Sequence, residues 1–260
     1  MLVDSHCHLD MLDLAASDGS LQPFLDAAHD NGIEHMLCVS VNFEDWPRMC
    51  DKVRGHPEVS ISVGVHPDHA DCHEPTVAEL VERSGEAGVV AIGETGLDYY
   101  HGEGDLEWQR ERFRTHIRAA RECGKPLIVH TREAREDTLR ILREEQAEEA
   151  GGVLHCFTED YDMARQAMEL GFYISFSGIV TFKNAVKLKE VARQVPLERL
   201  LVETDSPYLA PVPKRGKPNQ PAYVRHVAEY LAELRGESFA ELAAATTGNF
   251  YRLFRSVSRA

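Results

Sequence analysis

The first ten residues, MLVDSHCHLD (1–10), join an apolar pair to side chains that commonly bind metals. Leu2 and Val3 predict the start of a short buried strand. The polar residues then take every second position: Asp4, His6, His8 and Asp10. Because strand side chains switch faces at each residue, His6 and His8 point the same way and can bind one metal ion or two. Asp4 shares that face, and we expect it to orient one histidine through its second ring nitrogen.

Short apolar runs of this kind recur along the chain at intervals of roughly thirty residues. Val, Ile and Leu dominate them, as in strands buried on both faces of a parallel sheet. The further runs are HMLCVSV (35–41), VSISVGVHP (59–67), GVVAIGE (88–94), PLIVH (126–130), GVLHCF (152–157), FYISFSG (172–178) and LLVETDSP (200–207). Charged segments with helical spacing separate them, among them 105–125, 135–152 and 159–171. Eight strands alternating with helices predict an α/β fold, a closed (β/α)8 TIM-type barrel.

The length and charge of the chain limit its organisation and its partners. A chain of 260 residues fits one such barrel, so we expect a single domain over 1–260, with extra C-terminal helices at 221–235 and 237–255. The net charge of −15 repels polyanions, so phosphate chemistry needs bound metal or a local basic patch. We expect no signal peptide and no membrane span. Six cysteines without a CxxC pair predict a reduced, cytoplasmic protein.

Ligand-type residues gather at the C-terminal ends of the predicted strands. They are His6, His8, His66, Glu94, His130, His155 and Asp205. In a closed barrel these strand ends meet at one mouth, where the active sites of this fold lie. Burying so many imidazoles and carboxylates costs several kcal/mol each unless they are paired or bound to metal. A shared metal centre removes this cost, although a single buried histidine is more often an ordinary core residue.

The ligand types predict which metals bind. Imidazoles with carboxylates favour Zn²⁺ or Mn²⁺, with Mg²⁺ as the third candidate. Six ligands are too many for one catalytic zinc with open positions, so we expect two divalent ions, bridged by Glu94 as a catalytic residue. The expected ligands are His6, His8, Glu94, His130, His155 and Asp205. Two ions about 3.5–4 Å apart can hold a hydroxide between them and clamp a phosphodiester in line.

The chain resembles the TatD-like metal-dependent deoxyribonucleases, a branch of the amidohydrolase-type barrels, over nearly its whole length. The motifs are DSHCHL (4–9), GVHP (64–67), GETGLDYY (93–100), PLIVHTR (126–132), LHCF (154–157), GFYISFSGIVTFKNA (171–185), LLVETDSPYLAP (200–211), RGKPNQP (215–221) and TTGNFYRLF (246–254). The resemblance implies a TIM-type barrel, usually with two divalent ions on the same six residues. It implies hydrolysis of DNA phosphodiesters, often from a strand end; some relatives instead remove D-amino acids from tRNA. One departure is Glu159, where relatives commonly have glycine.

We predict roles in catalysis or substrate binding for Asp205, for His66 and for Arg132. We expect Asp205 to bind a metal and to accept the proton of the attacking water as general base. His66 is predicted to contact the scissile phosphate or the leaving oxygen, with a solvated loop histidine as the alternative. Arg132 can bind a phosphate through its forked guanidinium, or can pair with Glu133 or Glu136.

The remaining substrate contacts are expected at the rim of the mouth. Tyr100 is predicted to stack on a base, or else to pack the mouth. The segment PVPKRGKPNQP (211–221) holds the densest basic cluster of an acidic chain. We expect its Arg215, Lys217 and Asn219 to contact nucleic acid, with a solubilising turn as the alternative.

Three functions stay open at this point. The favoured one is a metal-dependent nuclease that acts on single-stranded DNA or on 3′ ends as an exonuclease. The second is an ester or amide hydrolase, such as a D-aminoacyl-tRNA deacylase, with tRNA as its partner. The third is a non-catalytic metal-binding protein, which has no need of open metal positions at a barrel mouth. We expect a monomer or weak oligomer and no membrane partner.

Overall fold

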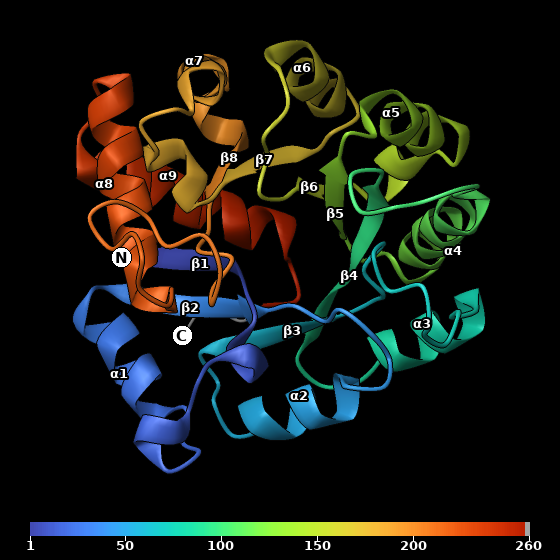
Figure 1. The fold of residues 1–260 in the computed structure, drawn as a ribbon, viewed down its shortest axis with the longest axis horizontal. Helices are drawn as coiled ribbons and strands as arrows, with labels where there is room; N and C mark the ends of the chain where they lie inside the picture. The colour runs from blue at the N-terminus through green and yellow to red at the C-terminus, as the bar shows by residue number, and fades with distance from the viewer. Residues whose placement is uncertain (258–260) are drawn as a thin grey trace.

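Eight parallel strands form a nearly closed barrel in the computed structural model, which describes residues 1–257 (Figure 1). Their spatial order is their order in the sequence, and the sheet runs from β1 to β8. The strands are β1 (Leu2–Cys7), β2 (Ile33–Cys38), β3 (Val59–Val63), β4 (Val89–Asp98), β5 (Leu127–Arg132), β6 (Gly152–Leu154), β7 (Tyr173–Phe176) and β8 (Leu200–Val202). The TIM-type barrel predicted from the apolar runs is therefore confirmed.

Helices surround this barrel, mostly one after each strand (Figure 1). They are α1 (Gln22–Asp30), α2 (Trp46–Val53), α3 (Val77–Ser84), α4 (Glu107–Cys123), α5 (Arg135–Glu144), α6 (Tyr161–Glu169), α7 (Val186–Gln194), α8 (Val224–Arg235) and α9 (Phe239–Leu253). Short 3-10 turns are η1 (Leu9–Met11), η2 (Ala15–Ser17), η3 (Ala147–Glu149), η4 (Gly178–Thr181), η5 (Leu197–Arg199) and η6 (Pro221–Tyr223). The helix expected over 135–152 ends at Glu144, because Gln146 has a left-handed φ of 55° and interrupts it.

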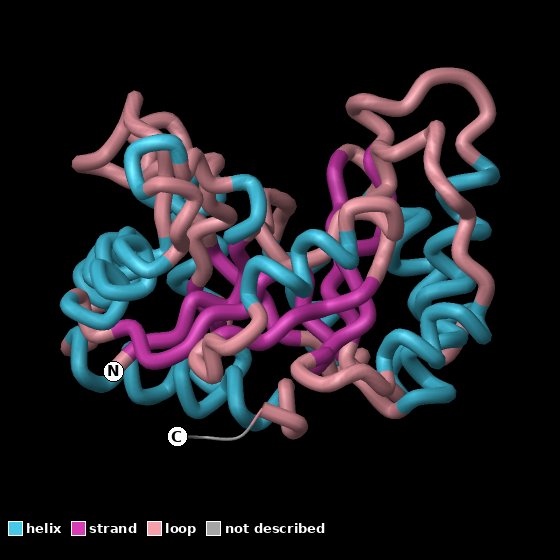
Figure 2. Tube along the Cα trace, turned by 90° about the horizontal axis from the view of Figure 1, so that it is seen from below, coloured by secondary structure: helices cyan, strands magenta, loops and turns pink. Residues whose placement is uncertain are grey.

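The two extra C-terminal helices are α8 and α9, and α9 crosses the N-terminal end of the barrel (Figures 1 and 2). A capping box of Ser238 and Glu241 starts α9. Its Phe250 and Phe254 are fully buried and belong to a small apolar cluster with strand residues such as Val90. This cluster joins residues of seven strands, so it fills the inside of the barrel, while a larger core lies between strands and helices.

Close backbone contacts hold the strand ends that carry the polar residues. β1 approaches the end of β8, because Asp205 N donates to His6 O at 2.9 Å and His8 N donates to Ser206 O at 2.8 Å. β4 approaches β5 at Gly96, where φ is +133° and an added Cβ would lie 2.0 Å from His130 O. Only glycine fits there. None of the described helices is both long and apolar enough to cross a membrane.

Candidate metal centre

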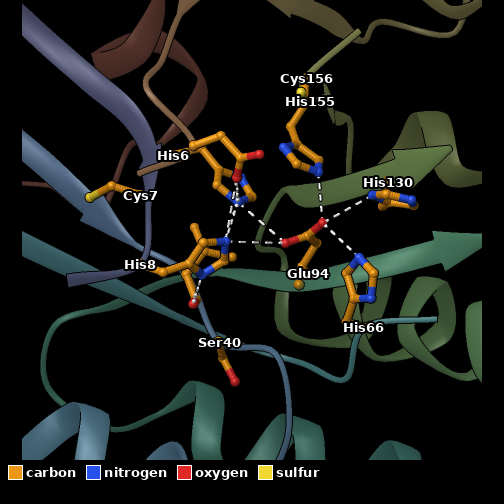
Figure 3. A network of polar contacts seen from close by, with 12 residues as sticks. His6, Cys7, His8, Ser40, His66, Glu94, His130, His155 and Cys156 are labelled. Carbon is orange, nitrogen blue, oxygen red and sulfur yellow. Dashed lines mark hydrogen bonds and ion pairs between the residues drawn. The ribbon is translucent and has the colours of Figure 1, made fainter. Parts of the chain in front are cut away.

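The polar residues predicted at the strand ends meet at the mouth of the barrel around the carboxylate of Glu94 (Figure 3). Glu94 lies on β4 and is 2% exposed. Its side chain points to the centre of the mouth, and imidazoles from four separate strand ends turn toward it (Figure 3). The two carboxylate oxygens face different sets of ligands, so the site has two halves.

The Oε2 half is formed by the end of β1 and by the segment after β8. His6 Nε2 lies 3.2 Å from Glu94 Oε2 and 3.6 Å from Asp205 Oδ1. His8 Nε2 lies 3.5 Å from Asp205 Oδ1 and 3.9 Å from Glu94 Oε2. The two Nε2 atoms are 3.3 Å apart. His6 and His8 thus point the same way, as the alternation predicted.

The Oε1 half consists of three imidazoles, from the ends of β3, β5 and β6. His155 Nε2 lies 2.7 Å from Glu94 Oε1. His66 Nε2 and His130 Nδ1 each lie 3.3 Å from the same oxygen. His66, Glu94 and His130 form a group whose atoms could hold a metal ion. His66, which the sequence predicts as a substrate contact, is therefore also a candidate metal ligand.

Hydrogen-bond acceptors fix the far ring nitrogens of three of these imidazoles, and a carboxylate lies beside the far nitrogen of a fourth. His8 Nδ1 lies 3.0 Å from Val39 O, and His66 Nδ1 lies 2.5 Å from Asp68 Oδ1. The other two imidazoles are supported by buried carboxylates: His130 Nε2 lies 3.2 Å from Asp98 Oδ2, and His155 Nδ1 lies 3.4 Å from Glu203 Oε1. Such partners orient an imidazole and make its inner nitrogen a better ligand.

The predicted role of Asp4 is wrong. Its carboxylate accepts hydrogen bonds from Thr204 N at 2.8 Å and from Thr204 Oγ1 at 2.5 Å, so it joins β1 to the end of β8. The far nitrogen of His6, Nδ1, is buried without a hydrogen-bond partner among the described residues. The residues that do support histidines are Asp98 and Glu203. Asp98 ends the GETGLD motif, and Glu203 lies two residues before Asp205.

The charges of the cluster stabilise one another strongly. Burial alone would raise the pKa of the Glu94 carboxyl, but His155, His66 and His6 outweigh it and hold that pKa well below its ordinary value. Burial would lower the pKa of His155, yet Glu94 outweighs it and raises the pKa well above its ordinary value. For Asp205 the nearby histidines outweigh burial and lower the pKa. The carboxylates of this site are therefore ionised and attract cations.

The donor atoms also fit metal ions by their spacing. Two ligands around a tetrahedral zinc with bonds of about 2.0–2.1 Å lie about 3.3 Å apart. Apart from one shorter and one longer contact, the distances within the two halves range from 3.2 to 3.6 Å. His6, His8 and Asp205 form one group able to hold an ion, and His66, Glu94 and His130 form another.

A cavity of about 580 Å³ lies over the metal centre and contains some of the expected substrate residues. His66, Arg132 and Asp205 line it. The guanidinium of Arg132 stacks on the ring of Tyr100 at 3.8 Å, and the pairing of Arg132 with Glu133 or Glu136 is not seen among the described ion pairs. Tyr100 itself is 56% exposed and does not line the cavity.

The remaining expected substrate residues lie outside this cavity. Asn219 is buried, and its Nδ2 donates to Thr204 O at 2.8 Å and Tyr208 O at 2.6 Å, so it supports the loop after β8. Arg215 is exposed and stacks on Phe182 at 3.9 Å. Lys217 is exposed on the same loop. The departure at Glu159 follows β6, where the side chain is half-buried and burial raises the pKa of its carboxyl.

Comparison with known proteins identifies the family. Residues 3–255 match the family model for the TatD related DNases. The chain is 54% identical over 254 residues to the uncharacterized metal-dependent hydrolase YcfH of Escherichia coli K12, which covers 97% of this chain and 95% of that protein. It is 33% identical over 229 residues to the 3′-5′ ssDNA/RNA exonuclease TatD of Escherichia fergusonii, covering 86% and 88%. The crystal structure of the TatD homologue YJJV from Escherichia coli K12 superposes with a TM-score of 0.89 at 28% identity, covering 98% of both chains.

The barrel with this polar mouth thus defines a metal-dependent hydrolase. Within that class, the chain belongs to the TatD-related DNase family.

Proposed function

We propose that this hydrolase cleaves phosphodiester bonds of single-stranded DNA from a strand end, using two divalent ions. The observation that carries the proposal is the division of the Glu94 carboxylate, whose two oxygens each face a separate set of imidazoles. The name of the Escherichia fergusonii relative supports single-stranded nucleic acid as the substrate class.

Each residue of the centre has a task that follows from its position. His6, His8 and Asp205 would hold one ion, and His66 and His130 the other, with Glu94 shared between them. His155, which lies 2.7 Å from Glu94 Oε1, would be a further ligand on that side. When bound, divalent ions would activate water and neutralise charge on the phosphodiester. Asp98 and Glu203 keep the ring nitrogens of His130 and His155 directed at the centre.

Asp205 is our candidate for the general base. Its carboxylate stays ionised beside His6 and His8, and it lines the cavity from which a water would approach. It can therefore accept the proton that the attacking water loses. Arg132 also lines the cavity; its forked guanidinium has no ion pair among the described residues and can bind a phosphate.

Hydrolysis of end-labelled oligonucleotides tests the proposal. The protein would be stripped of metal, reloaded with Zn²⁺, Mn²⁺ or Mg²⁺, and given single-stranded DNA labelled at either end. We expect nucleotide release that needs added metal, stops with chelator and begins at one end. Internal fragments from the first time points would contradict exonucleolytic cleavage. Hydrolysis of D-aminoacyl-tRNA without any cleavage of DNA would contradict the phosphodiester assignment.

A further inference from the structure

The rim of the mouth is divided into sectors of opposite charge. Residues 177–187, after β7, and 206–220, after β8, contain no Asp or Glu and five Lys or Arg. The cations are Lys183, Lys187, Lys214, Arg215 and Lys217. We call these two segments the cationic rim. In a chain of net charge −15, so long a stretch without acids is a marked segregation.

The two segments of the cationic rim pack on one another and form one continuous surface. Val212 N donates to Thr181 Oγ1 at 2.9 Å, and the Arg215 guanidinium lies over the Phe182 ring at 3.9 Å. An added Cβ at Gly178 would lie 2.0 Å from Leu209 O, so the two backbones touch. Figure 1 shows both segments on the left of the mouth, beside α7 and α8.

None of the five cations of the cationic rim forms an ion pair with a described residue. Arginines on the neighbouring helices do: Arg165 pairs with Glu169 on α6, and Arg193 pairs with Glu190 on α7. Lys183 and Lys187 are exposed. Their charge is therefore available to an anion from outside.

The opposite side of the mouth has the reverse composition. The segments 42–47, 66–79 and 98–107, after β2, β3 and β4, contain ten Asp or Glu and no Lys or Arg. Arginines of the following helices neutralise some of these acids, as Arg48 does for Asp45. This opposite side lies to the right and bottom of Figure 1. A polyanion is attracted electrostatically to the cationic rim but not to this side.

The cationic rim also exposes apolar side chains. Tyr208 is 54% exposed, Val212 47% and, at the start of α7, Val186 62%. Tyr208 also lines the cavity over the metal centre, so apolar contacts lead from the cavity outward. Single strands present unstacked bases that bind such side chains, whereas a duplex hides its bases. The combination fits a single strand better than a duplex.

We propose that a single strand of nucleic acid leaves the cavity across the cationic rim and contacts Lys183 and Lys187 outside it. This inference rests on the proposed function, since it assumes a nucleic-acid substrate. It adds a binding surface beyond the cavity, formed by the loop after β7 together with the loop after β8.

Binding of oligonucleotides of different lengths tests the proposal. The protein with its bound metal would be titrated with a labelled phosphorothioate dodecamer and a matching dinucleotide, which resist cleavage, and followed by fluorescence anisotropy. In Lys183→Glu/Lys187→Glu we expect the dodecamer to bind at least tenfold more weakly, so that its advantage over the dinucleotide shrinks. The dependence of log affinity on log salt should become less steep by about 1.4, because each phosphate contact on a single strand contributes about 0.7.

The matched control is Arg165→Glu/Arg193→Glu, which changes the net charge equally, but on α6 and at the end of α7 away from Lys187. It should bind the dodecamer as the wild type does. An equal loss in both variants would overturn the proposal, since net charge alone would then explain it. An unchanged dodecamer affinity in Lys183→Glu/Lys187→Glu would also overturn it, provided the melting temperature shows a folded protein.

Two further outcomes separate this inference from the proposed function. In the first outcome, the wild type cleaves the unmodified dinucleotide and dodecamer, and Lys183→Glu/Lys187→Glu binds both oligonucleotides as tightly as the wild type does. Only the inference about the cationic rim then fails. If the wild type cleaves neither with any metal, the proposed function fails and this inference with it. Polyglutamate that competes with the dodecamer, and loses affinity in the same variant, would assign the rim to acidic polypeptides instead.

Discussion

Buried histidines occur in two regions of this barrel, and their surroundings differ. At the mouth, five imidazoles surround one carboxylate, and three of them have a hydrogen-bond acceptor on the far nitrogen. Away from the mouth, His35 and His116 are each buried alone. His35 Nε2 bonds Ser60 Oγ at 2.8 Å, and His116 Nε2 accepts from Val65 N at 3.0 Å.

The difference shows in the charge that each histidine carries. Burial lowers the pKa of His35 and of His116 to about 4, so both are neutral. At the mouth, Glu94 and Asp68 outweigh the burial of His66 and raise its pKa to about 9, whereas at His6 burial prevails and lowers the pKa. Burial by itself therefore does not identify a functional histidine. What the mouth histidines share, and His35 and His116 lack, is a contact with the carboxylate of Glu94.

The largest expected effect comes from the carboxylate that only the mouth histidines share. Glu94→Gln keeps the shape but removes the charge that both halves use, so we expect both ions to be lost and hydrolysis to fall to background. Metal content by mass spectrometry and nucleotide release measure the two effects. His35→Gln, at the isolated histidine, should keep the metal content of the wild type. Full metal content in Glu94→Gln would contradict the role of the shared carboxylate in metal binding.

Substitution of a ligand in one half of the site should affect metal binding in that half more than in the other. Asp205→Asn should lower turnover by about 10²–10⁴-fold, because the general base is lost. We expect the variant to retain metal on the Oε1 half, which contains no ligand from Asp205. His130→Asn is the mirror variant, with loss on the Oε1 half. Loss of all metal in both variants would show that the halves do not bind separately.

Acidification should affect the isolated histidines through stability. The pKa of His116 is about 4 in the folded chain against 6.5 in the unfolded chain, so the unfolded state binds more protons between these values. Its contribution of about 3 kcal/mol is complete above pH 6.5 and is lost as pH falls toward 4. Urea unfolding of wild type and His116→Gln, both in chelator, measures it. A difference between them that does not change with pH would contradict the assignment.

The smallest effect is expected from the carboxylates behind the ligands. Asp98→Asn should weaken metal binding by about 10–100-fold through His130, with little change in fold. Calorimetric titration of the stripped protein with Zn²⁺ measures it. Ser60→Ala, which removes the partner of His35, is the counterpart away from the mouth. It should leave metal affinity unchanged and cost about 1 kcal/mol of stability.

Sequence reasoning recovered the barrel and the contents of the mouth for a physical reason. Apolar runs of fixed spacing predict strands, and the ends of parallel strands converge, so His6, Glu94 and His130 could be brought together without a structure. The side of Glu94 that each residue faces could not be predicted. It depends on register at β1 and β4, where bulges shift the pairing.

Two buried polar residues show a second limit of sequence reasoning. Asp4 and Asn219 are buried polar residues beside the site that serve the backbone of the loop after β8. Sequence alone cannot distinguish a polar side chain that bonds a ligand from one that bonds a neighbouring peptide group. His66 shows the converse, since its ring reaches Glu94 only because β3 and β4 lie close together.

The two phenylalanines of α9 inside the barrel limit how substrate and product can move. Phe250 and Phe254 fill the N-terminal end of the barrel together with strand residues. Substrate, water and product therefore all have to pass through the mouth. On the proposed function, a released nucleotide would leave through the same opening by which the next part of the strand enters. Exit can then limit the cycle, and rapid mixing would reveal it as a first turnover faster than those that follow.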